Sequence, residues 1–392
     1  MAQLGSAHAW GAWGRRFKSC HPDFKGLLYI YLMVDNKKLI SKKKPFFNIS
    51  EKLEDFLKTH DRWIDDVISY DDLLRFSDSI NLYDKKNKDT LWVRLIFNES
   101  EREEIDNNLK IIYTLLHSDG NPSSIPYLSI DSVDYCTFGN SKPFRVKIRN
   151  IVNDNFTYFY VKKTDASRVY GIEFEHMLSP RNLNFLVNHS SLVEEHIAGI
   201  PGDIFIQDYL PKCSEVQKAQ IAKEYVKFNE RCMIRLLGDM RSYNYVVIPI
   251  HDFDQVIYKI RAIDFDQQSY EGKFSVYRPQ FFKENRAMMD IVRAKLKTDS
   301  ITQYKIEERS TISRRLIISD ERMKLLLAIM KDDTVSLKEN VISLKKEIFR
   351  FTNENSFLDC KSMGDLMEKT LKYLKRNYQN VSLIDLILKK LY

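Results

Sequence analysis

The architecture of this 392-residue chain can be inferred outward from two short stretches, Gly238-Asp-Met-Arg-Ser-Tyr-Asn244 and Ile260-Arg-Ala-Ile-Asp264-Phe-Asp266. The first stretch carries a carboxylate and an amide five positions apart and runs into an apolar segment. The second is an apolar segment that ends in a carboxylate. Because residues 251–255 form a turn between the two segments, we expect a β-hairpin that brings Asp264 beside Asn244. Such oxygen ligands are the kind that Mg²⁺ prefers.

Upstream of these stretches the sequence predicts a small antiparallel sheet followed by helices. The segment 156–163 is β-rich and ends in two lysines, Lys162 and Lys163. Beyond residue 310 the pattern is helical and charged. The expected strands are 127–137, 144–152, 156–163 and 191–197, and the expected helices before residue 310 include 167–178 and 215–236.

Composition excludes several classes of protein. Hydrophobic residues make up 44% and charged residues 29% of the chain, which is typical of a globular protein. Lys and Arg total 61 against 54 Asp and Glu, a net charge of +7, and they are dispersed, so no nucleic-acid partner is expected. The longest apolar run, 27–34, is far shorter than the ~20 residues of a membrane helix, so no membrane partner is expected either. The five cysteines are scattered, which indicates reduced thiols and a cytoplasmic location.

Transfer of a phosphoryl group from ATP needs few special parts. A cation must hold the phosphates, an acid must position that cation, oxygen ligands must hold Mg²⁺, and a carboxylate must orient or deprotonate the attacking hydroxyl. The chain supplies a strand that ends in lysine, a helical segment with two glutamates, and the two polar stretches, in that order. This order favours a phosphotransferase.

Residues 126–290 resemble the aminoglycoside phosphotransferase and choline kinase-like branch of the protein kinase fold. Gly-Asp-Met-Arg-Ser-Tyr-Asn is similar to the catalytic loop of that branch, and Ala-Ile-Asp-Phe-Asp is similar to its metal-binding motif. Phe159-Tyr-Val-Lys162-Lys-Thr-Asp resembles its third strand, and Leu192-Val-Glu-Glu195-His-Ile-Ala-Gly199 resembles the hinge strand whose backbone pairs with adenine. The resemblance implies an α+β, two-lobed fold with a small antiparallel β lobe and a larger helical lobe.

The resemblance also implies ATP and Mg²⁺ as cofactors, and it gives each matching residue a role. Asp239 would be the catalytic base, and Asn244 and Asp264 the Mg²⁺ ligands. Lys162 would hold the α- and β-phosphates, with Lys163, on the opposite face of the strand, as the alternative.

The remaining implied contacts surround the nucleotide. Tyr160 would lie against adenine, Glu195 would belong to the hinge strand, and Gly139 is what remains of the phosphate loop. Glu173 or Glu175 would pair with the lysine. The two glutamates lie about 200° apart on a helix, so only one can face it, and the sequence leaves that choice open.

Several departures from the family pattern motivate a second interpretation. Leu237 stands where the family usually has histidine before Gly-Asp, and the phosphate loop keeps a single glycine. No activation-segment motif follows Asp264. The alternative is therefore a non-catalytic, pseudokinase-like protein that binds nucleotide and serves as an interaction module. The hydroxyl acceptor, a small molecule or a protein, is not identified by the sequence.

We expect four regions along the chain. Residues 1–32 resemble a mistranslated tRNA gene and are predicted to be a gene-model artefact with Met33 as the start, the alternative being a genuine basic arm. Residues 33–122 are expected to form an N-terminal α/β extension that could dock a protein partner. Residues 123–200 are the predicted β lobe and hinge, and 201–392 the helical lobe with its C-terminal helices.

Overall fold

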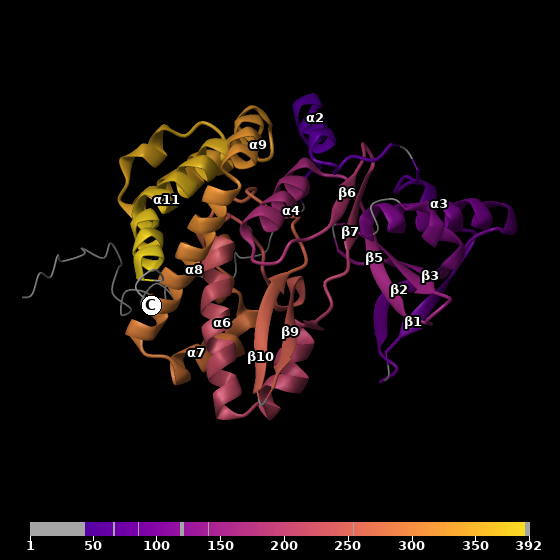
Figure 1. Cartoon of the computed structure of the whole chain (residues 1–392), viewed down its shortest axis with the longest axis horizontal. Helices are drawn as coiled ribbons and strands as arrows, with labels where there is room; N and C mark the ends of the chain where they lie inside the picture. The colour runs from indigo at the N-terminus through magenta and orange to yellow at the C-terminus, as the bar shows by residue number, and fades with distance from the viewer. Residues whose placement is uncertain are drawn as a thin grey trace, which may run out of the picture.

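The computed structural model describes residues 44–388 except 66, 85, 118–120, 140 and 254, so the predictions for residues 1–32 lie outside the described residues. Figure 1 shows two lobes: a β-rich lobe on the right and a helical lobe on the left, with α4 between them. An antiparallel sheet lobe joined to a helical region confirms the predicted α+β class with two lobes. None of the helices in the described ranges is long and apolar enough to cross a membrane.

The β lobe is built on one sheet of seven strands in the order β1-β2-β3-β4-β5-β7-β6, and all neighbours pair antiparallel. The predicted boundary at residue 122 falls between two strands of this sheet, because β2 pairs with β3. The strands are β1 (Asp78–Tyr83), β2 (Asp89–Ile96), β3 (Leu128–Cys136), β4 (Phe144–Asn150), β5 (Phe156–Lys163), β6 (Phe185–Val187) and β7 (Ser191–Glu195).

Side chains alternate across this sheet and give it one apolar and one polar face. Phe159 and Val161 of β5 are fully buried on the apolar face. Helix α3 (Glu99–His117) covers that face with Ile105, Leu109 and other apolar side chains. Because α3 closes the apolar face, the side chains between these positions on β5 lie on the opposite, polar face of the sheet.

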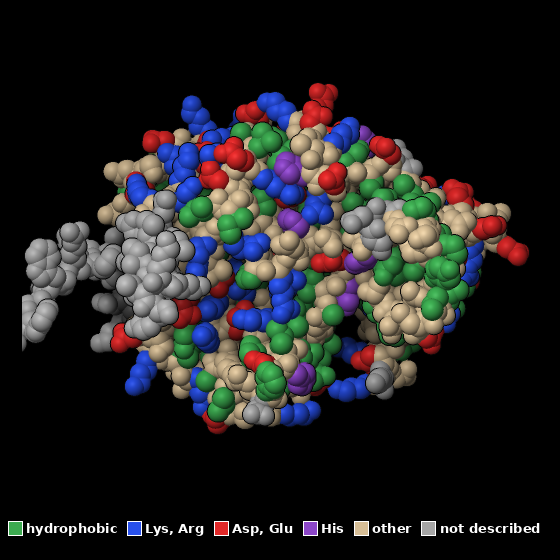
Figure 2. Space-filling view, viewed as in Figure 1, with side chains coloured by type: hydrophobic (Ala, Val, Ile, Leu, Met, Phe, Trp, Pro, Cys, Tyr) green, Lys and Arg blue, Asp and Glu red, His purple; other side chains and the backbone are tan. Residues whose placement is uncertain are grey.

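The helical lobe carries a second, three-stranded sheet in the order β10-β9-β8. In Figure 2 the visible surface of the helical lobe shows Lys and Arg interspersed with Asp and Glu, the dispersed pattern that the composition predicts. The strands are β8 (Ile200–Pro201), β9 (Tyr245–Asp252) and β10 (Gln255–Ala262). The helices outside the β lobe are α2 (Glu51–Thr59), α4 (Ala166–Leu178), α5 (Gly202–Ile204), α6 (Glu215–Ile234), α7 (Arg286–Lys295), α8 (Thr298–Ile318), α9 (Asp320–Asp332), α10 (Lys338–Thr352) and α11 (Met363–Leu388).

Helix α4 follows β5 in the chain but packs in the core of the helical lobe. Val169 and Phe174 are fully buried in that core. Gly171 allows a close approach, since an added Cβ would lie 3.0 Å from the Cβ atoms of Phe265 and Gln268. The helix therefore rests directly on the segment that follows the second polar stretch.

Candidate functional site

The predicted β-hairpin is present and joins the two polar stretches. β9 and β10 pair antiparallel from Asp252 and Gln255 at the turn to Tyr245 and Ala262 at the open end. One further hydrogen bond extends the ladder, because the amide of Ile263 donates to the carbonyl oxygen of Asn244 at 3.0 Å. Asp264, the next residue, is therefore placed next to Asn244.

The loop that contains Asp239 is held closed by its own polar groups. Asp239 has a positive φ of 56°, a backbone conformation that aspartate tolerates better than most residues. Its amide donates to the carbonyl of Val276 at 3.2 Å, and its own carbonyl accepts the side-chain Nδ2 of Asn244 at 2.7 Å. This second bond fixes the Asn244 amide and leaves Oδ1 as its oxygen ligand atom.

The carboxylate of Asp239 lies in an ion pair that sequence reasoning did not anticipate. Nε of Arg241 donates to Oδ1 of Asp239 at 2.9 Å, and Nη1 of the same arginine donates to Glu284 at 2.8 Å. Burial alone would lower the pKa of Arg241, but the carboxylates of Asp239 and Glu284 raise that pKa. The carboxylate of the candidate base is thus paired with a guanidinium within its own motif.

Lys162 reaches from the polar face of the sheet toward the second stretch. Its Nζ donates to Oε2 of Glu194 at 2.7 Å, and both side chains are buried, with 7% and 6% of their surface exposed. The same Nζ lies 3.5 Å from the carbonyl oxygen of Ile263, the residue before the metal-ligand candidate. A lysine of the β lobe thereby contacts the backbone of the residue that precedes Asp264 in the helical lobe.

The prediction that a glutamate of α4 pairs with this lysine is wrong. Glu173 pairs with Arg322 of α9, and Glu175 pairs with Arg235 and, at 3.6 Å, with Arg261. Burial alone would raise the pKa of Glu175, but the two arginines lower it. The physical reason is the packing of α4 inside the helical lobe, whose arginines neutralise both buried carboxylates.

The donor set at the hairpin end fits Mg²⁺. Asp264 is half-buried, and its Oδ1 accepts the amide of Asp266 at 3.1 Å. In the described part of the chain no group of three or more His, Cys, Asp and Glu could hold a metal ion. A site of one carboxylate and one amide oxygen suits Mg²⁺, which usually keeps several waters and binds substrate phosphates.

A buried charge network supports the end of β5 and the segment after Asp264. Arg168 of α4 donates to Asp266 at 2.8 Å and to the backbone carbonyl of Lys163 at 2.6 Å. Lys44 lies 2.6 Å from Asp165 and 3.8 Å from Asp266. Asp266 therefore supports the loop by hydrogen bonding, whereas no sequence motif marked Lys44 or Arg168.

Two further predicted contacts lie on opposite sides of β5. The hydroxyl of Tyr160 lies 3.3 Å from Nδ1 of His196, on the lysine side of the strand. Nζ of Lys163 lies 5.5 Å from the ring centroid of Phe46, on the other side, so the alternative phosphate anchor points away from the site.

Glu195 and Gly139 are the remaining predicted residues, and the backbone amide of Glu195 is in a hydrogen bond with a neighbouring segment. The amide of Glu195 donates to the carbonyl of Asn184 at 3.1 Å, and so this hinge amide is engaged within the sheet. Burial raises the pKa of the Glu195 carboxyl. Gly139 has a φ of +86° in the β3–β4 loop, where an added Cβ would meet no atom within 4 Å.

The polar face beside Tyr160 carries a charged row that sequence reasoning missed. Asp134 of β3 is buried between Arg94 of β2, at 3.0 Å, and Arg145 of β4, at 2.8 Å. Arg145 also lies 4.5 Å from the ring centroid of Trp92. Since Arg145 pairs with Tyr160 across the sheet, the surface where a base would stack is bordered by a guanidinium.

The carboxylates of Asp239 and Asp264 both act on the hydroxyl of Tyr243. The pKa of Tyr243 is raised, first by burial and then by the negative charges of Asp239, Glu284 and Asp264, while Arg241 opposes them. One hydroxyl therefore senses both carboxylates. The four predicted groups at 162, 239, 244 and 264 gather at the junction of the lobes.

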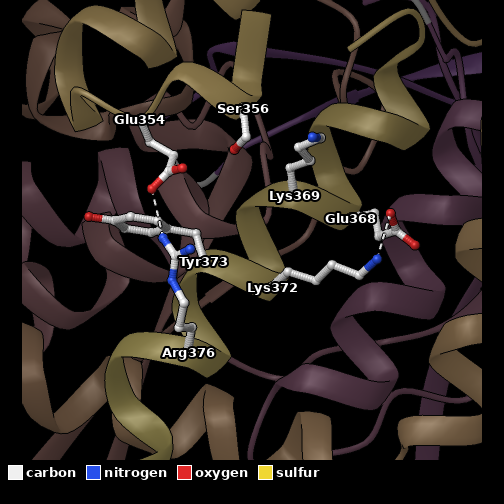
Figure 3. A pocket seen from close by; sticks show the side chains of 7 residues that line it. All are labelled: Glu354, Ser356, Glu368, Lys369, Lys372, Tyr373 and Arg376. Carbon is white, nitrogen blue, oxygen red and sulfur yellow. Dashed lines mark hydrogen bonds and ion pairs between the residues drawn. The ribbon is translucent and has the colours of Figure 1, made fainter. Parts of the chain in front are cut away.

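A separate hollow of about 300 Å³ lies on the helical lobe, away from this junction (Figure 3). Its acids are already paired: Glu354 lies 2.7 Å from Arg376, and Glu368 lies 3.0 Å from Lys372. None of the predicted site residues lines it. The lining residues are Glu354, Ser356, Glu368, Lys369, Lys372, Tyr373 and Arg376.

Comparison with known proteins gives likenesses among solved structures. No family model matches the chain, and no curated protein matches it. Among solved structures it is similar to the autoinhibited serine kinase domain of the giant muscle protein titin, at 13% identity and a TM-score of 0.27, over 62% of this chain and 92% of that one. At this identity and TM-score the likeness does not test the resemblance to the aminoglycoside phosphotransferase branch.

Proposed function

We propose that this chain is a phosphotransferase that uses Mg-ATP and acts on a hydroxyl acceptor, a small molecule or a protein. One observation carries the proposal: Nζ of Lys162 lies 3.5 Å from the carbonyl of Ile263, whose amide in turn bonds to the backbone of Asn244. The cation proposed to bind phosphate thus lies beside the segment that carries the oxygen ligands proposed for the metal, which is the arrangement that phosphoryl transfer requires.

Each side chain has a defined task in this proposal. Lys162 leaves Glu194 when the nucleotide binds and donates to its phosphate oxygens instead. Bound Mg²⁺ would neutralise charge on the phosphates, held by Asn244 and Asp264. Asp239 accepts the proton of the acceptor hydroxyl as its oxygen bonds to the γ-phosphorus and the bond between that phosphorus and ADP breaks.

The ion pair at Asp239 suits the role of base. The guanidinium of Arg241 favours the ionised carboxylate, which is the form that can accept a proton. Because Arg241 also bonds to Glu284, it has a second partner when Asp239 turns toward an acceptor. In this proposal, the ion pair with Arg241 balances the charge of Asp239 until an acceptor hydroxyl takes its place.

Transfer of label from γ-labelled ATP to pooled metabolites or lysate proteins tests the proposal. Asp239→Asn should lower turnover by roughly 10²–10⁴-fold while nucleotide binding persists. Asp264→Asn should weaken Mg-ATP binding and abolish transfer, whereas Asp252→Asn, at the exposed far end of the same hairpin, should change neither. Equal Mg-ATP binding by wild type and Asp264→Asn would refute the site assignment.

A pseudokinase-like function is the second candidate, and the occupied state of Asp239 favours it. A carboxylate clamped by Arg241, together with a phosphate loop that keeps only Gly139, would suit a protein that binds nucleotide without transfer. Its partner would be a protein docked on the extension at 33–122. Thermal stabilisation by ATP without any transfer would support it, and sustained turnover would exclude it. A cytoplasmic location belongs to both proposals.

A further inference from the structure

The polar face of the β lobe carries aromatic side chains that the proposed nucleotide site does not use. Helix α3 covers the other face of the sheet. On the polar face, Trp92 of β2 and Tyr158 of β5 are half-buried, and Phe156 of β5 is 56% exposed. The ring centroids of Phe156 and Tyr158 lie 5.8 Å apart. Single apolar side chains are normal at a protein surface, but a group of aromatic ones is typical of a contact surface.

The sheet places basic side chains of β4 beside these rings. The guanidinium carbon of Arg145 lies 4.5 Å from the ring centroid of Trp92 and 5.6 Å from that of Tyr158. Nζ of Lys147 lies 4.3 Å from the ring centroid of Phe156, and Lys147 pairs with Tyr158 across the sheet. These contacts join the rings and the cations into one continuous row across β2, β4 and β5.

The cations of this face are more exposed than the acids that pair with them. Asp134 is only 1% exposed, whereas Arg94, which lies 3.0 Å from it, is 46% exposed. Asp131 is 21% exposed, and its partner Arg149, also at 3.0 Å, is 41% exposed. Asp154, in the β4–β5 turn at the edge of the face, is an exposed acid that pairs with Arg149 as well. The middle of the face therefore presents its cations to solvent in front of its carboxylates.

This grouping is not visible in the composition, in which Lys and Arg are dispersed and no nucleic-acid partner is expected. Alternate residues of a strand share a face of the sheet. Arg145, Lys147 and Arg149 therefore come together on the polar face, although Val146 and Ile148 separate them in the sequence. The fold thus makes a local basic and aromatic surface from a chain with dispersed charge.

We infer that this face of the sheet binds single-stranded nucleic acid. Unpaired bases stack on aromatic side chains, and the open face of an antiparallel sheet is a common platform for them. Basic side chains beside the rings bind the phosphates. Rings stack on planar bases but not on the carboxylates of an acidic peptide, so the aromatic members favour nucleic acid over an acidic protein. The residues that form the surface are Trp92, Arg94, Arg145, Lys147, Phe156 and Tyr158.

The surface is separate from the proposed nucleotide site, and the inference does not depend on the proposed function. None of the six residues has a role in that site. The two surfaces are nevertheless neighbours, because Tyr158 lies two positions before Tyr160 on the same face of β5. A strand bound here would therefore lie next to the junction of the lobes.

Fluorescence anisotropy of a labelled oligouridylate of about 12 nucleotides, titrated with the whole chain without ATP, tests the stacking contacts. Phe156→Leu keeps an apolar side chain but loses the ring, so it should weaken binding roughly ten-fold, the scale of one stacked base. Because Phe156 is exposed, this change should not prevent folding. Phe253→Leu, at an exposed ring in the turn of the β9–β10 hairpin, is the matched control and should leave binding unchanged.

The dependence of binding on salt tests the phosphate contacts. Each phosphate neutralised in a single strand contributes about 0.7 to the slope of the logarithm of affinity against the logarithm of salt concentration. Lys147→Gln should therefore weaken binding and reduce the slope by about that amount. Lys218→Gln on α6 is the control, because both lysines lie 3.1 Å from a carboxylate and are 28% and 24% exposed. It should change neither quantity.

Further arms separate the source of the strand and the place where it binds. Tighter binding of oligouridylate than of oligothymidylate would indicate contacts to 2′-hydroxyls, and any other ranking would indicate recognition of bases and phosphates alone; both results support the inference. Absence of saturable binding, or equal binding by Phe156→Leu and wild type, would overturn it. Polyglutamate that binds as tightly as the oligonucleotide would indicate an acidic protein partner and would overturn it too. Displacement of the oligonucleotide by Mg-ATP would place it in the nucleotide site and would overturn this inference while leaving the proposed function intact.

Discussion

The buried pair of Lys162 and Glu194 gives the sharpest test of the site's construction. Replacing Lys162 by Met leaves a carboxylate that is only 6% exposed without its cation. Replacing Glu194 by Leu strands the ammonium, because its other acceptor, the carbonyl of Ile263, lies at 3.5 Å, the outer limit of a hydrogen bond. Each single change should therefore lower the free energy of unfolding by about 3–5 kcal/mol.

The double variant should cost less than either single change, because an apolar pair replaces both charges. Urea unfolding followed by the fluorescence of Trp92, on β2 of the same sheet, measures all four corners of the cycle. Lys162→Met combined with Glu173→Gln is the control, and these changes should add within about 0.5 kcal/mol because Glu173 pairs with Arg322 instead. Additive effects for Lys162 and Glu194, or strong coupling to Glu173, would refute the assignment of the lysine's partner.

Two further predictions concern stability. Burial, and then the charge of Arg62, lowers the pKa of His176 from 6.5 to about 4. The unfolded chain therefore binds the extra proton first, so stability should fall as the pH drops from about 6.5 to about 4, and His176→Gln should flatten this dependence in thermal melts at several pH values. Gly202→Ala should destabilise the chain by about 1–3 kcal/mol, because the added Cβ would overlap the ring of Tyr245. Gly139→Ala, in open space at positive φ, should cost only about 1–2 kcal/mol, and calorimetric melting that ranks the two glycine variants in the reverse order would contradict this reading.

The sequence was sufficient to predict the parts of the site that are local in the chain. Asn244 and Asp264 are separated by one hairpin, and the alternation of apolar residues with turn residues predicts both its strands and their register. The side of β5 on which Lys162 lies follows from the two-residue period of a strand, which also separates it from Lys163. These predictions needed no knowledge of distant packing.

The partner of Lys162 could not be predicted in the same way. Glu194 and Glu195 are adjacent, and only the register of β5 against β7 decides which carboxylate shares the lysine's face. One of the two glutamates of α4 was expected to face the lysine, because the family resemblance implies such a pair. Their actual partners, Arg322 for Glu173 and Arg235 for Glu175, lie 149 and 60 residues away in the chain, so no local pattern signals them.

Arg168 links the two lobes beside the candidate site. Its guanidinium bonds both to the carbonyl of Lys163, at the end of β5, and to Asp266, two residues after the metal-ligand candidate. It is fully buried, so separating the lobes at this point would expose or strand a charge, which is costly. Arg168 therefore joins the end of β5 to the segment after Asp264, and this connection does not involve Glu173 or Glu175 of α4. In the proposed function, we therefore expect the lobes to separate around the connection from β7 to β8, where the chain passes between the two sheets, rather than at Arg168.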